Sequence, residues 1–265
     1  SRLLRPGARP VLEGSRVLRG EQWAARLLQR LPNDGRLQQW MLTDVKLLKE
    51  DQTSQVGLLE VDGECCYLKH YRGRTRLQSM LYRQGRGRPT RAFDGAAALW
   101  QAGVAVPRPL CCLSVPGGAV LLAEGIADAR DLQDLAVENG LGAVDKHMLS
   151  AVASLLGCLH GAGYAHGDCK WSNLLCAGGH WYLVDLDSVS PCREGSPKQA
   201  RDIARFTLNA EEMALSRQHF EHFLDTYVEA TEWTRETLLS AVSPFLEKFR
   251  RRHRVRYGVR GHRLI

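Results

Sequence analysis

The sequence predicts an α+β fold with two lobes: a small antiparallel β lobe followed by a larger helical lobe. Up to residue 126, short apolar runs alternate with turn residues such as Asp62-Gly63, a pattern typical of strands joined by hairpins. After residue 131, apolar residues recur at helical spacing, as they do from Met148 to Leu159. We therefore predict an N-terminal extension (1–40), a β-rich lobe ending in a linker near Gly125 (41–126) and a helical lobe (127–265).

Each element follows from local pattern. In the extension, Gly20 to Leu31 places its leucines on one helical face and ends before Pro32. The β-rich lobe centres on a predicted hairpin with arms at 56–61 and 64–71. We expect its other strands at 45–48, 110–113 and 119–126, with a helix at 91–102. In the helical lobe we expect helices at 148–159, 207–224 and 234–256, the last kinked or split by Pro244.

The composition is that of an ordinary globular protein: of 265 residues, 44% are hydrophobic and 25% are charged. No apolar run approaches the roughly 20 residues of a membrane-spanning helix. The first residues, Ser1 to Pro6, lack the apolar centre of an export signal, so we expect a cytoplasmic protein. None of the eight cysteines forms a C-x-x-C pair, which favours buried reduced thiols over a zinc site.

The positive charge is concentrated in two segments. The formal net charge is +7. Residues 72–91 contain seven arginines and no acid, and residues 248–265 contain Lys248 and seven arginines, again with no acid. Such segments indicate a polyanionic partner, and the candidates are a phosphorylated glycolipid, an anionic membrane surface or nucleic acid. An exposed arginine-rich face without a partner is the alternative for either segment alone.

The most specific pattern is the run His166-Gly167-Asp168-Cys169-Lys170-Trp171-Ser172-Asn173, followed by Val184-Asp185-Leu186-Asp187. This spacing is typical of phosphoryl transfer from ATP. We predict that Asp168 accepts the proton of a substrate hydroxyl and that Lys170 offsets the charge of the transferred group. Asn173 and Asp185 supply the oxygen ligands that Mg²⁺ prefers. The alternative makes Asp168 a turn residue and Asn173 a helix cap.

Other residues are weaker candidates. Lys69 lies within a hairpin arm and is a candidate for binding the ATP phosphates, although strand lysines are often only solvent-exposed. The loop 49–55 lacks the glycines of a phosphate-binding loop, so Gln52, Thr53 and Ser54 would contact ATP through their side chains, or the loop is simply surface. We expect His166 to hold the loop rather than transfer protons. Asp187 is either a second metal ligand or, as we favour, a turn residue.

At these residues the chain resembles the protein-kinase-like superfamily and, within it, the bacterial lipopolysaccharide core kinases that act on heptose or Kdo. The glycine of H-G-D is similar to small-molecule and glycolipid kinases, whereas H-R-D is commoner in protein kinases. The resemblance runs from about residue 42 to about residue 230. It rests on Tyr67-Leu68-Lys69-His70, Ala102-Gly103-Val104-Ala105-Val106-Pro107, Leu122-Ala123-Glu124-Gly125-Ile126, residues 159–169 and Leu183-Val184-Asp185-Leu186-Asp187.

The resemblance implies a bilobal kinase-like fold and further roles. Glu124 to Ile126 would be the hinge whose backbone binds adenine, and Asp202 would brace the catalytic loop. It also implies a peripheral protein on the cytoplasmic face of the inner membrane that phosphorylates the lipopolysaccharide inner core. Anionic lipid and core phosphates would then meet a patch formed by Arg72, Arg74, Arg76, Arg250, Arg251 and Arg252. We expect no nucleic-acid partner.

The sequence departs from the kinase pattern at one residue expected to help bind ATP. Position 92 is alanine where such kinases have the glutamate that pairs with the strand lysine, and Asp94 lies on a different helix face. This departure, with the glycine-poor loop, favours a weakly active pseudokinase or binding protein as one alternative. A second alternative is a phosphotransferase for a soluble small molecule such as an aminoglycoside. An ATP-dependent kinase of the lipopolysaccharide inner core is the leading prediction.

Overall fold

The computed structural model describes residues 12–265, apart from the side chain of Leu141. The chain forms two compact units. The N-unit contains the residues up to Ala97 together with Pro107–Ala127, and the C-unit contains Ala98–Val106 and Asp128–Ile265. Within the described residues, no helix is both long and apolar enough to span a bilayer.

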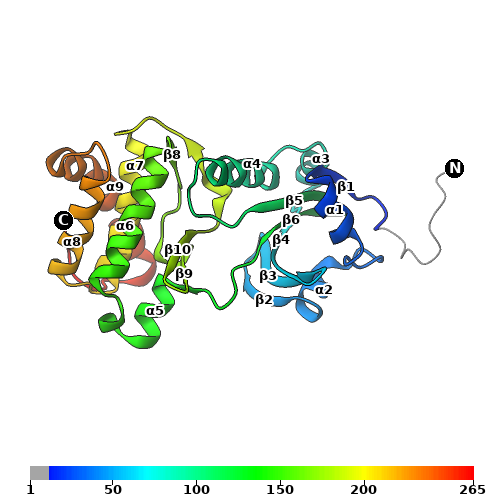
Figure 1. Ribbon diagram of the computed structural model, residues 1–265, viewed down its shortest axis with the longest axis horizontal. Helices are drawn as coiled ribbons and strands as arrows, with labels where there is room; N and C mark the ends of the chain where they lie inside the picture. The colour runs from blue at the N-terminus through cyan, green and yellow to red at the C-terminus, as the bar shows by residue number, and fades with distance from the viewer. Residues whose placement is uncertain (1–11) are drawn as a thin grey trace. The chain divides into compact units, whose positions relative to one another are not determined.

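The N-unit is built on a six-stranded sheet in the order β1-β5-β6-β4-β3-β2 (Figure 1). Each neighbouring pair is antiparallel. The predicted hairpin is confirmed: its arms pair from Ser54↔Tyr71 to Val61↔Glu64 around a turn in which Asp62 and Gly63 both have positive φ. The strands are β1 (Arg16–Arg19), β2 (Lys46–Glu50), β3 (Ser54–Val61), β4 (Glu64–Arg72), β5 (Pro109–Val115) and β6 (Gly118–Glu124).

The two faces of this sheet carry different partners. On one, the α1/α2 face, strand residues such as Leu68 and Val120 form a core with helices α1 (Glu21–Leu28) and α2 (Leu37–Thr43). Successive strand residues point to opposite faces, so the neighbours of these residues define the other, the Lys69 face. On it Tyr71 and Ala119 pack with Tyr82 of α3 (Arg76–Arg83).

Three elements of the N-unit escape the sequence analysis. The extension contributes β1, which pairs with β5 and completes the sheet edge. Helix α2 buries only Leu37 and Met41, too few residues to show a periodic pattern. Helix α3 lies inside the arginine-rich segment and has one buried residue, Tyr82. The predicted helix at 91–102 is confirmed as α4 (Arg88–Gln101), which begins one turn earlier.

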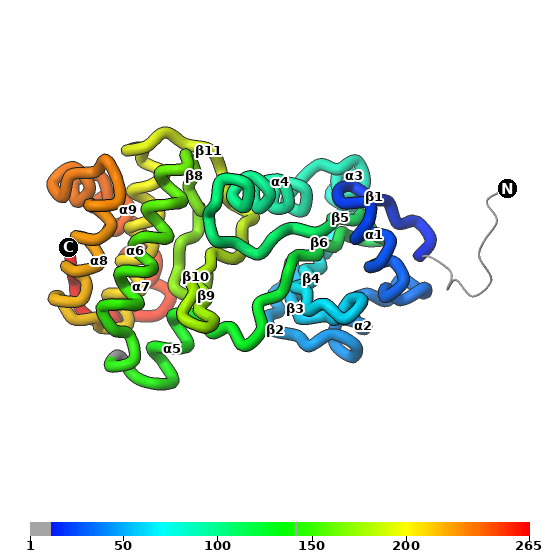
Figure 2. The backbone as a smooth tube through the Cα atoms, viewed as in Figure 1, coloured from blue at the N-terminus to red at the C-terminus, as the bar shows by residue number. Residues whose placement is uncertain are grey.

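The C-unit is mainly helical, as predicted (Figure 2). In it α7 packs along α9 and α6 packs along α8. The core contains a stacked aromatic pair, Phe206 and Phe223, with ring centroids 4.1 Å apart. The helices are α5 (Leu132–Asn139), α6 (Lys146–Gly161), α7 (Pro197–Glu212), α8 (Arg217–Glu229) and α9 (Arg235–Tyr257).

The prediction of a single helix at 207–224 is wrong, because the chain forms α7 and α8 there. Ala214 has a φ of 57°, which no helix accommodates, and the Ser216 side chain then accepts from His219 N to cap α8. Helix α7 also begins earlier, with Pro197 in its first turn. In contrast, α9 continues through Pro244 without a break.

Short strands position the loops of the C-unit. Strands β7 (Arg130–Asp131), β9 (Leu174–Ala177) and β10 (His180–Leu183) form one small sheet, and β8 (Tyr164–Ala165) pairs with β11 (Ser190–Pro191). The H-G-D-x-K-x-x-N run therefore spans the connection from β8 to β9. All eight cysteines are unpaired, but Cys65 and Cys158 are exposed, so the expectation of buried thiols is wrong for these two.

Candidate functional site

Residues 166–173 of the C-unit, the predicted catalytic loop, pass very close to the backbone of another segment at Gly167. Gly167 has a φ of +86°, and a Cβ there would lie 2.7 Å from both the Cβ and the carbonyl oxygen of Ser188. Only glycine fits without moving the backbone around Ser188. The structure thus explains why the central residue of H-G-D is glycine in this chain.

Asp202 of α7 holds the backbone of this loop through hydrogen bonds. Its carboxylate is 1% exposed and accepts from His166 N at 2.6 Å and from Gly167 N at 2.9 Å. His160 Nε2 adds a third hydrogen bond at 3.0 Å. Burial raises the pKa of Asp202, but the hydrogen bonds from the His160 side chain and the His166 backbone outweigh it, so the pKa lies below its usual value. Asp202 is thus an ionised anchor for the loop.

The anchor extends to α8. His160 Nδ1 lies 2.6 Å from the hydroxyl of Tyr227, and both residues are fully buried. If Nε2 carries the proton toward Asp202, Nδ1 accepts from the tyrosine hydroxyl, and every group in the chain is satisfied. His160 and Tyr227 could not be identified from the sequence, because a buried position on a helix accounts for each of them.

Asp168 lies between two cations. Its side chain is 38% exposed, with Oδ2 3.2 Å from Lys170 Nζ and Oδ1 3.6 Å from Arg205 Nε. The two cations thus flank a carboxylate that is reachable from solvent and could accept a proton from a substrate hydroxyl. Arg205 of α7 was not identified from the sequence. The only signal is its position one helical turn, or three residues, after Asp202.

Asn173 and Asp185 belong to neighbouring segments of the loop region. Asn173 is only 2% exposed, and its Nδ2 donates to the carbonyl of Asp168 at 2.9 Å, which orients the amide and leaves Oδ1 as the atom that can accept or bind a cation. The Asn173 carbonyl accepts from Val184 N at 3.1 Å, beside Asp185 in the chain. An amide oxygen and a carboxylate suit a hard divalent cation. Among the described residues no group of three or more His, Cys, Asp or Glu could hold a metal. A cation at Asn173 and Asp185 would therefore need further oxygens from a bound phosphate compound or from water.

The Asp185 backbone is unusual, and His166 helps to hold it. Asp185 has a φ of 59°, in the left-handed region that few residues other than glycine adopt. His166 Nε2 lies 2.9 Å from the Val184 carbonyl, and its Nδ1 accepts from Asp168 N at 3.2 Å. The imidazole is fully buried and joins the catalytic loop to the Val184–Asp185 segment. Asp187 follows in a short 3-10 turn, Leu186–Ser188.

The remaining predicted residues lie in the N-unit. Lys69 is on β4 opposite Val56 and Leu121, and its Nζ lies 4.9 Å from the centroid of the Tyr71 ring. Ala92 is buried, and position 92 therefore supplies no carboxylate to pair with Lys69. Asp94, the nearby alternative, is held by both Nε and Nη2 of Arg19, at 2.9 and 3.0 Å.

The loop between β2 and β3 is pinned by its own side chains. The Asp51 carboxylate accepts from Thr53 N, Thr53 Oγ1 and Ser54 N at 2.6–2.8 Å. Burial raises the pKa of Asp51, but these hydrogen bonds outweigh it and lower the pKa to about 2. The Thr53 and Ser54 hydroxyls therefore organise the turn, and Ser54 is only 5% exposed.

In the segment expected as a hinge, Glu124 to Ile126, several backbone groups already form hydrogen bonds within the protein. Glu124 N donates to the Arg108 carbonyl at 2.8 Å, and Gly125 N donates to the Cys65 carbonyl at 2.9 Å. The Tyr67 hydroxyl donates to the carbonyl of Ile126 at 3.2 Å. The Glu124 carboxylate pairs with Arg108 on the surface. These contacts fix the backbone of this segment within the N-unit.

The arginines of the predicted patch have different environments. Arg74 and Arg76 are exposed, but Arg72 is bound to Glu50 and to the carbonyl of Asp51. Arg250 is only 10% exposed and binds Glu211, Glu247 and the carbonyl of Ile265. Arg250 is therefore a structural residue of the α7–α9 contact, whereas Arg251 and Arg252 are exposed.

Comparison with known proteins identifies the family and the fold of this chain. A family model, the lipopolysaccharide kinase (Kdo/WaaP) family, matches residues 38–227. The fold is similar to that in the solved structure of WaaP in complex with acyl carrier protein, with a TM-score of 0.56 and 19% sequence identity, covering 91% of this chain and 99% of that chain. No curated protein matches the sequence significantly. Because the family model spans more than half of its length, this chain belongs to the lipopolysaccharide kinase (Kdo/WaaP) family and is a kinase with a bilobal α+β fold.

Proposed function

We propose that the protein transfers the γ-phosphoryl group of ATP to a heptose or Kdo hydroxyl of the lipopolysaccharide inner core, with Asp168 as the catalytic base. The observation that supports this most is the construction of the catalytic loop. Asp202 anchors its backbone, Asn173 binds the carbonyl of Asp168, and two cations flank the Asp168 carboxylate. This is a preorganised proton acceptor in a chain of a lipopolysaccharide kinase family.

The same proposal assigns the cofactor ligands. Lys69 would bind the ATP phosphates, and Asn173 Oδ1 with Asp185 would hold Mg²⁺, which when bound supplies charge neutralisation on the phosphates. Lys170, 3.2 Å from Asp168, is placed to offset negative charge near the proton acceptor. The backbone around Glu124 and Ile126 would meet adenine, and the turn at Thr53 and Ser54 would cover the phosphates as a fixed rather than a glycine-rich loop.

Activity on defined acceptors tests this proposal. ATP radiolabelled in its γ-phosphate should label lipopolysaccharide whose inner core lacks phosphate, in a magnesium-dependent way, and mass spectrometry of the product should place the new phosphate on heptose or Kdo. Label on an aminoglycoside but not on the core would instead establish the soluble small-molecule alternative. ATP binding without label on either acceptor would establish a weakly active binding protein, consistent with Ala92 in place of an acid.

We also propose that the protein binds the anionic inner-membrane surface through the end of α9. Four arginines there are exposed, and the apolar side chains of Val255 and Val259 are 91% and 81% exposed among them. Basic residues around exposed apolar ones are typical of helices that lie at a membrane interface. This α9 basic surface consists of Arg251, Arg252, Arg254, Val255, Arg256 and Val259.

Charge reversal tests the α9 basic surface. The double variant Arg252→Glu and Arg256→Glu should weaken binding to phosphatidylglycerol-containing vesicles by about 30-fold or more, because each arginine contributes roughly 1 kcal/mol near an anionic surface. Vesicle cosedimentation at increasing salt measures it, and wild-type binding should fall as salt rises. The matched control reverses two exposed arginines elsewhere, Arg30 and Arg193. An equal loss in both double variants would reject a specific surface.

A further inference from the structure

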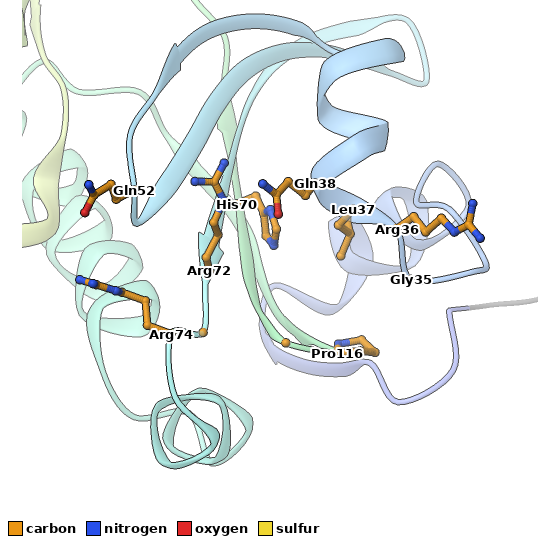
Figure 3. Close-up of a pocket in the computed structure, with 11 residues that line it drawn as sticks. Gly35, Arg36, Leu37, Gln38, Gln52, His70, Arg72, Arg74 and Pro116 are labelled. Carbon is orange, nitrogen blue, oxygen red and sulfur yellow. The ribbon is translucent and has the colours of Figure 1, made fainter.

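A polar cavity of about 420 Å³ opens in the N-unit beside the start of α2 (Figure 3). Its walls come from the segment before and into α2, the β2–β3 turn, the end of β4 and the β5–β6 turn. Figure 3 shows Leu37 and Gln38 on one side, His70 and Arg72 in the middle, and Gln52 and Arg74 on the other side. This volume is within the range of small-molecule sites.

The cavity is on the sheet face opposite Lys69. His70 is paired with Val120, which belongs to the core of the α1/α2 face, whereas Lys69 is paired with Leu121. Directly paired strand residues point to the same side, and neighbours along a strand point to opposite sides. The cavity is therefore separate from the Lys69 face. It lies where the apolar core of the α1/α2 face ends and polar side chains replace it.

Buried hydrogen bonds fix the protonation of His70. Gln55 is fully buried, and its Nε2 donates to the Gln38 carbonyl and to Glu50 Oε1. Gln55 Oε1 is therefore the atom 3.3 Å from His70 Nδ1, and Nδ1 must carry the proton. Burial and the charge of Arg72 lower the pKa of His70 to about 4, so the ring is neutral at physiological pH.

This arrangement leaves His70 Nε2 as a hydrogen-bond acceptor. His70 is only 5% exposed and lines the cavity, and no hydrogen-bond partner for Nε2 is found among residues 12–265. The neighbouring wall is free of side chains because Gly73 and Gly117 form it, with Gly73 N bonded to the Gly117 carbonyl at 2.7 Å. Nε2 is therefore an accessible acceptor on a mostly buried ring, and an acceptor beside open space is suited to a hydroxyl donor from a ligand.

Cationic groups provide the second feature of the cavity. No acidic side chain lines it. Arg72 is balanced by Glu50, yet its Nε is buried and finds no acceptor among the described residues. Arg74 is exposed at the rim and forms no ion pair within residues 12–265. In contrast, Arg36 extends away from the cavity in Figure 3, with its Nε 3.6 Å from Asp34. Arg74 is thus the charge that an anion would meet first.

We propose that this cavity binds a small phosphorylated polyol of the sugar-phosphate class. A hydroxyl of the ligand donates to His70 Nε2, and its phosphate accepts from Arg74 and from the side-chain amide of Gln52, which lie on the same side of the cavity. An arginine beside a neutral amide favours an anion, and an unprotonated imidazole favours a hydroxyl. The same phosphate and hydroxyl groups occur in free sugar phosphates and in phospholipid headgroups.

Calorimetric titration of the full chain tests the cavity with four probes: glucose 6-phosphate, inorganic phosphate, glucose and soluble short-chain phosphatidylglycerol. Glucose 6-phosphate should bind at least about tenfold more tightly than phosphate or glucose alone, because only it engages both features. Tighter binding of phosphatidylglycerol would identify the headgroup as the source. Binding should persist in saturating ATP. It should also shift the NMR signals of the His70 imidazole nitrogens, which would locate the ligand on this face of the sheet.

Two exposed arginines provide matched variants that should both fold. Arg74→Gln should weaken glucose 6-phosphate binding about tenfold or more, to the level of glucose. Arg83→Gln, which removes an equal charge from α3 outside the cavity, should leave it unchanged. Equal affinities in the two variants, displacement by ATP, or phosphate binding as tightly as glucose 6-phosphate would each overturn the proposal.

Discussion

Replacement of Asp168 with alanine should lower phosphate transfer to the lipopolysaccharide core by about 100- to 10,000-fold. The variant loses the carboxylate proposed to accept the hydroxyl proton, while Lys170 and Arg205 stay in place around an empty position. Transfer of labelled phosphate from ATP measures the effect, under conditions where the wild type is linear in time. The fall should be in kcat, because the proposed role of Asp168 concerns the reacting hydroxyl rather than ATP binding.

Folding must be checked in the same variant. Asp168 is 38% exposed, so its ion pairs are screened by solvent and their loss should cost no more than about 1 kcal/mol. Circular dichroism and the melting temperature should therefore match the wild type. The matched control is Asp225→Ala, which removes an exposed aspartate of α8 paired with Arg235 and should retain full activity. Full transfer activity in the Asp168→Ala protein would sink the proposed mechanism.

Replacement of Asp202 with alanine should have the largest effect on stability. The change leaves His166 N, Gly167 N and His160 Nε2 without their buried acceptor. Removing one partner from such a network costs about 3–5 kcal/mol. Chemical denaturation should show this as a lower free energy of unfolding. Transfer activity should fall too, because the loop that carries Asp168 loses its anchor.

The pH dependence has a defined sign. Because the pKa of Asp202 is lowered in the folded protein, its stabilisation is present above the pKa of an unfolded aspartate and is lost as pH falls through the folded value. The Asp202→Ala protein should lack that part of the acid-induced loss. Asp145→Ala is the control: it removes the cap that binds Met148 N at the start of α6 and should cost only about 1 kcal/mol. Equal stabilities of the two variants would contradict the anchor role.

Local pattern predicted much of the fold and failed at identifiable places. The β3–β4 hairpin was predictable because Asp62-Gly63 supplies the positive φ of a tight turn between alternating strands. The break between α7 and α8 was not, because Ala214 is a strong helix former. It nevertheless adopts positive φ in the turn that ends α7, where Leu215 N donates to the Ala210 carbonyl. Strand β1 escaped because its pairing with β5 joins residues almost a hundred positions apart.

Some residues of the candidate site could be predicted from the sequence and others could not. The residues of the catalytic loop could be found because their chemistry is fixed by short spacing along the chain, from His166 to Asn173. Arg205 and Tyr227 could not. Arg205 comes near Asp168 only through the position of α7, and Tyr227 bonds His160 because α8 packs along α6. The same holds for Arg250, which sequence groups with the exposed arginines and the structure places in an ion pair with Glu211.

The sequence by itself determined the order of the β and helical parts, the H-G-D-x-K-x-x-N run and which residues are candidates for its chemistry. These are properties of neighbours along the chain, where periodicity and turn chemistry act. Tertiary structure alone decided which charges are buried or free, that Asp168 lies between two cations, and that His70 faces a cavity opposite Lys69. Those properties depend on contacts between distant segments and on exclusion of water, which no local pattern encodes.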